Sequence, residues 1–109
     1  VDATTGFTWS YFLTTKGTTP QTMLNLVNLL EERYKILVKF LRCDGAGENI
    51  KTRSLMLKEK PRVQFQITSR DTPQHNGQVE RKIATIYGKV TAVLNAGGFE
   101  ETLRKQLWA

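Results

Sequence analysis

The sequence has 109 residues, which is enough for one small domain. Hydrophobic residues make up 39% of the chain, which argues against disorder, and no apolar run approaches the roughly 20 residues that a membrane-spanning helix needs. The net charge of +6 favours an anionic partner such as nucleic acid, but it fits a solvated basic surface equally well. The opening "VDATTGFTW" is neither basic nor apolar, so no signal peptide is expected.

The first part of the chain predicts a strand, a helix and a second strand. "FTWSYFL" (7–13) alternates between apolar and polar residues, which predicts a strand preceded by a turn at Thr5-Gly6. Residues 18–34 follow the 3.6-residue period and predict a helix that has Thr19 as its N-cap. "KILVKFLRC" (35–43) is a nearly continuous apolar run, which predicts a strand buried on both faces.

The second part predicts a short helix around residues 52–59 and a strand at 63–69, followed by two helices. The longer of these helices follows the loop "SRDTPQHNG" and ends at residues 95–98, and the last one covers 99–108. An apolar stripe is expected along the longer helix, at Val79, Ile83, Ile86, Val90 and Val93 or Leu94. The order predicts an α/β domain with a small sheet of about three strands plus a stub.

Two carboxylates lie at the ends of predicted elements, where α/β domains commonly have their functional sites. Asp44 ends the most buried predicted strand, and Glu80 lies in the first turns of the longest helix, with 35 residues between them. Two carboxylates that met at one edge of the sheet would repel unless a divalent cation, Mg²⁺ or Mn²⁺, lay between them. Taken singly, each residue also has an ordinary structural interpretation: Asp44 as a turn or N-cap residue, and Glu80 as a complement to the helix dipole.

Cys43 is the only cysteine and His75 the only histidine. A single cysteine cannot form an internal disulfide, and this pair cannot make a Cys/His zinc site. Because Cys43 lies in an apolar strand pattern, a buried and unreactive thiol is expected.

The motif "RCDGAGE" and the motif "TPQHNGQVERK", which contains Glu80, together resemble the catalytic core of integrases from Ty1/copia-type retrotransposons. "VDATTGFTWSYFL" and "LNAGGFEETLRKQLWA" also resemble segments of that family, so the resemblance covers nearly the whole chain. It implies an RNase H-like fold, a mixed sheet flanked by helices. It also implies DNA integration by 3′-end processing and strand transfer, the activity of a polynucleotidyl transferase.

The resemblance also implies roles for particular residues. Asp44 and Glu80 would be the second and third members of an Asp-Asp-Glu triad that binds Mg²⁺ or Mn²⁺ and catalyses two-metal phosphoryl transfer. Gln74 and Asn76, in the loop before Glu80, would approach the DNA end. Arg81 and Lys82 would contact the DNA backbone.

The chain departs from the family pattern in several places. The first triad Asp is expected upstream, and Asp2 is not that residue; it is expected to bond the following turn. Residues 1–109 are therefore interpreted as a partial integrase domain that lacks the first strand and is inactive by itself. Ala84 stands where the family commonly has Arg, so a phosphate contact is lost. Glu48 matches a family acid, and a role in structuring its loop is favoured over metal binding.

The resemblance implies retrotransposon DNA ends and target DNA as partners, a homo-oligomer in the full-length protein, and an intracellular, nuclear location without membrane attachment. Two other functions stay open. One is a decayed or domesticated remnant that binds nucleic acid without catalysis. The other is a related RNase H-like nuclease, against which the "TPQHNGQVER" loop argues.

Overall fold

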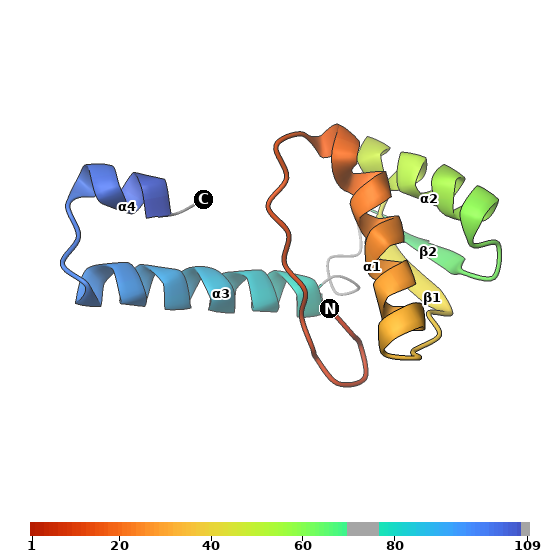
Figure 1. The fold of residues 1–109 in the computed structure, drawn as a ribbon, viewed down its shortest axis with the longest axis horizontal. Coiled ribbons are helices and arrows are strands. Elements are labelled where there is room, and N and C mark those ends of the chain that lie inside the picture. Colours follow the sequence, from red (N-terminus) through yellow and green to blue (C-terminus); the bar gives the residue numbers. More distant parts are fainter. Residues whose placement is uncertain (70–76, 108–109) are drawn as a thin grey trace. The chain divides into compact units, whose positions relative to one another are not determined.

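The computed structural model describes residues 1–69 and 77–107 (Figure 1). The elements in chain order are η1 (Lys16–Thr18), α1 (Thr19–Arg33), β1 (Phe40–Asp44), α2 (Gly47–Glu59), β2 (Gln64–Thr68), α3 (Gly77–Ala96) and α4 (Glu101–Leu107). The chain divides into two compact units. Leu13–Asn76 forms the sheet unit, and Val1–Phe12 together with Gly77–Ala109 forms the α3 unit.

The sheet unit is built on a β–α–β segment. β1 and β2 pair in parallel, with Phe40 opposite Gln64 and Asp44 opposite Thr68, and α2 connects the two strands. Parallel strands require a crossover of this kind, because the end of one strand and the start of the next lie at opposite edges of the sheet. α1 packs beside α2 (Figure 1).

The core of the sheet unit lies between these helices and one face of the sheet. Leu24 and Val27 of α1 meet the fully buried Met56 of α2 and Val63, which precedes β2. Half-buried hydrophobic residues pack against this cluster, namely Val38, Leu41, Leu55 and Phe65. Leu41 and Phe65 belong to the two strands, so the helices cover the face of the sheet from which these side chains project.

β1 is covered on one face only within the sheet unit. Leu41 and Cys43 are half-buried, while the alternate residues Phe40, Arg42 and Asp44 are exposed. The prediction that this strand is buried on both faces is therefore wrong. The strand is also shorter than predicted, because Lys35 has a left-handed backbone (φ 56°) that turns the chain out of α1 before β1 begins.

Three predicted elements of the sheet unit are confirmed with shifted ends. α1 lies within the predicted range, with Thr18 rather than Thr19 as its N-cap. β2 occupies the predicted strand, and its Ile67 side chain is 41% exposed. α2 begins at Gly47, five residues before the predicted start.

In the α3 unit, the N-terminal segment forms a closed turn rather than a strand. The backbone N–H of Asp2 donates to Phe7 O at 2.8 Å, and that of Gly6 donates to Asp2 O at 2.8 Å. Gly6 has φ 72°, which favours glycine, so the predicted turn at Thr5-Gly6 is confirmed. Residues 7–13 are all described and form no strand, so that prediction is wrong: the alternation is present, but the described part of the α3 unit supplies no second strand to pair with.

α3 confirms the predicted long helix, and most of its apolar stripe is exposed or half-buried. Among the described residues of α3 only Leu94 is buried, while Val93 is 66% exposed. The helix ends as expected: the Gly97 N–H donates to Val93 O at 3.0 Å, and Gly98 adopts φ 60°. A Cβ at Gly97 would lie 2.3 Å from the Phe99 ring, so any other residue there requires that ring to move.

The chain is therefore a mixed α/β protein, as predicted, but the sheet formed by residues 1–69 and 77–107 has two strands rather than three and a stub. The RNase H-like arrangement stays a prediction. No helix in these residues combines the length and apolar character needed to cross a membrane.

Candidate functional site

Asp44 lies at the carboxyl end of β1, where the chain turns into α2. Its Oδ1 accepts hydrogen bonds from the Ala46 backbone N–H at 3.1 Å and from Asn49 Nδ2 at 2.7 Å. These bonds fix the carboxylate and close the turn before the first residue of α2. Among the described residues no partner is recorded for the second oxygen, Oδ2, and the side chain is exposed. Asp44 thus has a structural role and still presents one free oxygen to solvent.

Glu80 lies in the first turn of α3 and is exposed. No hydrogen bond or ion pair to its carboxylate is recorded within the described ranges 1–69 and 77–107. The positive end of the helix dipole favours a carboxylate at this position, so Glu80 also satisfies its structural interpretation. The exposed and unpaired group could still act as an oxygen ligand.

The two basic residues after Glu80 differ in exposure. Arg81 is exposed, and its Nη1 lies 3.7 Å from where a Cβ would stand at Gly77, so its guanidinium folds back over the start of α3. Lys82 is half-buried, and its Nζ lies 3.7 Å from the Cβ position of Gly6. The Lys82 side chain therefore lies against the N-terminal turn of the α3 unit. Arg81 is the more accessible of the two cations.

Several predicted site features are not tested. Asp44 belongs to the sheet unit and Glu80 to the α3 unit, so the pairing of their carboxylates stays a prediction. Gln74, Asn76 and His75 lie outside the described residues. Within the described part of the chain, no three or more His, Cys, Asp or Glu side chains are arranged to hold a metal ion.

Glu48 lies in a helix rather than in the loop that it was predicted to structure. It lies in the first turn of α2, and its backbone oxygen accepts a 2.8 Å hydrogen bond from the buried Thr52 hydroxyl. Its carboxylate lies 3.9 Å from the Lys16 ammonium. The hydrogen bond involves only the backbone of Glu48, so a structuring role for its carboxylate stays a prediction.

Two groups have shifted pKa values with clear causes. Partial burial raises the pKa of the Cys43 thiol, and the negative charge of the neighbouring Asp44 raises it further, which supports the expected unreactive thiol, although the side chain is half-buried rather than buried as expected. The Thr5 hydroxyl and then the Thr5 backbone N–H donate to the Asp2 carboxylate and lower its pKa. The predicted role of Asp2, bonding the turn that follows it, is confirmed.

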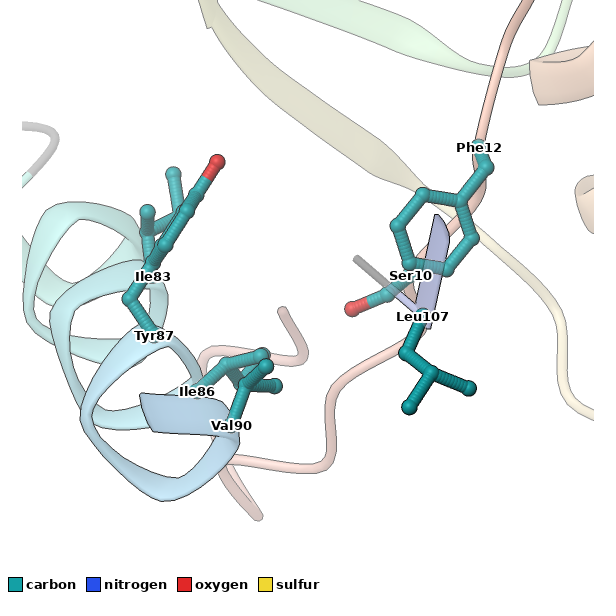
Figure 2. Close-up of a pocket in the computed structure, with 7 residues that line it drawn as sticks. All are labelled: Ser10, Phe12, Ile83, Ile86, Tyr87, Val90 and Leu107. Carbon is teal, nitrogen blue, oxygen red and sulfur yellow. The ribbon is translucent and has the colours of Figure 1, made fainter. Parts of the chain in front are cut away.

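The α3 unit also contains an open groove of about 490 Å³. Figure 2 shows Ile83, Ile86, Tyr87 and Val90 on the α3 side, with Ser10, Phe12 and Leu107 on the other. The lining is largely apolar and carries no carboxylate or cationic side chain; its polar side-chain groups are the hydroxyls of Ser10 and Tyr87.

One polar pair was missed by the sequence analysis. Arg42 Nε and Nη2 donate to Gln66 Oε1 at 3.3 and 3.1 Å across the exposed face of the sheet. The two residues are opposite each other in the parallel register. Strand alternation places Arg42 on the same face as Asp44, and that signal was present in the sequence. The partner Gln66 depends on strand register, which the sequence alone does not provide.

Comparison with known proteins gives no relative by which the chain could be assigned: no protein-family model, no curated protein and no solved structure matches it.

Proposed function

We propose that this chain belongs to the catalytic core of an integrase of the Ty1/copia retrotransposon type, and that it takes part in metal-dependent phosphoryl transfer on DNA. The observation that carries the proposal is the position of Asp44. It ends a parallel strand, it is held through one carboxylate oxygen, and it presents the other. A strand end is where an open α/β sheet holds its catalytic groups.

The donor set fits the metal that this chemistry requires. The Asp44 Oδ2 and the Glu80 carboxylate are hard oxygen donors, exposed, and without a recorded partner in the described residues. Mg²⁺ and Mn²⁺ accept few carboxylates and take further oxygens from water and phosphate. When bound, such an ion would stabilise the negative charge that develops on the transferring phosphoryl group.

The chain's own residues would supply binding and orientation. Asn49 and the Ala46 N–H hold the Asp44 carboxylate in one orientation, which reduces the entropy lost on metal binding. Arg81 is exposed one residue after Glu80 and would contact the DNA backbone. Gln74 and Asn76 would approach the DNA end, and Lys82 would add positive charge. A homo-oligomer acting on retrotransposon ends in the nucleus completes the proposal.

A second function is favoured by the same hydrogen bonds. Asp44 already serves the β1–α2 turn, and Glu80 already complements the α3 dipole. A chain that used both carboxylates only in this way would bind nucleic acid through its net charge of +6 and would perform no catalysis.

Duplex DNA binding with and without Mn²⁺ separates the two functions. We expect Mn²⁺ to strengthen binding of the unaltered chain, because the ion links carboxylates to phosphate, and Asp44→Asn or Glu80→Gln to remove that effect. Glu59 is an exposed acid on α2, so Glu59→Gln serves as the control and should still bind DNA more tightly when Mn²⁺ is added. If the response to Mn²⁺ is the same in all four proteins, the carboxylates bind no metal and the second function is favoured.

A further inference from the structure

The exposed face of the sheet carries a cation beside the candidate catalytic Asp. Arg42 and Asp44 alternate with the half-buried Leu41 and Cys43, so both side chains project to the uncovered side of β1. Residues two apart on a strand are separated by about 6.6 Å along it. A group bound at Arg42 would therefore lie close to a group bound at Asp44.

Arg42 is oriented but not neutralised. Its Nε and Nη2 both donate to Gln66 Oε1, which holds the guanidinium across the two strands. No ion pair to Arg42 is recorded among the described residues. A guanidinium has five N–H donors, so donors remain available, including both on Nη1. Fixing the planar group in advance lowers the entropy lost when a ligand binds.

The chemistry that matches this arrangement is phosphate. A charged and planar set of N–H donors pairs well with phosphate oxygens. Successive phosphates of one DNA strand advance by roughly 3.4 Å along the duplex axis. The Arg42 and Asp44 positions are thus separated by about the axial advance of two nucleotides. This choice of ligand rests on the proposed function, in which a phosphate of DNA lies at Asp44.

We propose that Arg42, held by Gln66, binds a backbone phosphate of duplex DNA about two nucleotides from the phosphate at Asp44. Arg42 is a positioning residue: it fixes where along the strand the DNA lies relative to the Asp44 carboxylate. The contact is made to the backbone and carries no base specificity.

Fluorescence anisotropy of a labelled duplex in EDTA, at several salt concentrations, tests the contact. We expect Arg42→Gln to weaken binding several-fold and to reduce the slope of log affinity against log salt by up to about 0.9. Arg53→Gln removes the same charge from an exposed position on α2 and should change much less. Arg42→Lys keeps the charge but loses the planar set of N–H donors, so its affinity for the duplex should lie between those of Arg42→Gln and Arg53→Gln. Equal losses in Arg42→Gln and Arg53→Gln would show an effect of net charge only and would overturn the proposal.

Asp44, two residues from Arg42, allows a second binding measurement that does not depend on how the Arg42 variants fold. In EDTA the Asp44 carboxylate repels a nearby phosphate, so Asp44→Asn should tighten binding, and the new side chain keeps an oxygen to accept the bonds from Ala46 and Asn49. Glu59→Gln is again the control. Unchanged affinity in Asp44→Asn would place the DNA elsewhere and overturn the inference. Both arms omit metal, so their failure is distinguishable from a failure of the Mn²⁺ response that tests the proposed function.

Discussion

Lys60 Nζ lies 2.6 Å from Glu31 Oε2 and so ties the end of α2 to α1. The side chains of Lys60 and Glu31 are only 22% and 13% exposed, and Arg62 Nη2 lies 3.8 Å from the same carboxylate oxygen. The pair is thus mostly removed from solvent and links the two helices.

Removing the Lys60 charge should destabilise the sheet unit. We expect Lys60→Gln to lower the free energy of unfolding by about 1–2 kcal/mol, between the effects typical of exposed and buried ion pairs. Lys16→Gln, in the same unit, breaks only the 3.9 Å contact of a side chain that is 87% exposed and should have little effect. Urea unfolding followed by circular dichroism measures both. Similar losses in the two variants would show that the Lys60–Glu31 pair adds nothing specific.

Met56 provides a test of the core assignment. It is fully buried between α1, α2 and the sheet, so Met56→Ala should lower the free energy of unfolding by about 2–5 kcal/mol through lost burial and a residual cavity. Its neighbour Leu57 is 55% exposed, and Leu57→Ala should cost far less. The same urea experiment compares them, and a Met56→Ala loss no larger than that of Leu57→Ala would mean that the core lies elsewhere.

The sequence predicted best those elements whose signals are local. The period and the N-terminal Thr-Pro pair located α1, and alternation located β2 within one residue of its ends. The start of α2 was predicted too late, because glycine is a poor helix former and Gly45 and Gly47 follow Asp44, whereas the Asp44–Asn49 hydrogen bond closes the turn and lets the helix begin at Gly47.

The predictions that were wrong concern features that depend on partners distant in sequence. Residues 7–13 alternate like a strand, but alternation does not provide a strand to pair with. The apolar run at 35–43 indicated burial on both faces, while the sheet unit supplies helices for one face only. At the candidate site, the positions of Asp44 and Glu80 at element ends were predicted. The Arg42–Gln66 pair was not, because it depends on the register between two strands.

The raised pKa of Cys43 gives a prediction about reactivity. Burial and the charge of Asp44 both disfavour the thiolate, which is the form that reacts with alkylating reagents. Asp44→Asn removes one of the two causes, so the pKa should fall, the thiolate fraction at a given pH should rise, and alkylation by iodoacetamide should be faster. Glu48→Gln, which removes a charge that does not perturb Cys43, is the control. An unchanged rate in Asp44→Asn would mean that burial alone keeps the thiol unreactive.

The open edge of β1 predicts self-association. Within the described residues β1 pairs only with β2, so its other edge has unpaired backbone groups, next to a Phe40 side chain that is 56% exposed. Phe40→Lys should raise the concentration at which light scattering detects aggregates. Leu57→Lys makes the same kind of change at a residue that is 55% exposed on α2 and should raise it less. If the two variants behave alike, general surface hydrophobicity drives the association, rather than the strand edge.

Ala84 gives the sharpest test of how α3 would meet DNA. It is exposed one helical turn after Glu80, so a cation placed there would lie beside the carboxylate that is proposed to hold the metal at the DNA end. We expect Ala84→Arg to tighten binding to two unrelated duplexes alike and to steepen the dependence of log affinity on log salt by up to about 0.9, because one more phosphate is contacted. Ala92→Arg adds the same charge to an exposed position two turns further along the helix and should have a smaller effect. Fluorescence anisotropy at several salt concentrations measures both variants. If Ala84→Arg binds no better than Ala92→Arg, or favours only one duplex, then the start of α3 does not lie along the DNA backbone.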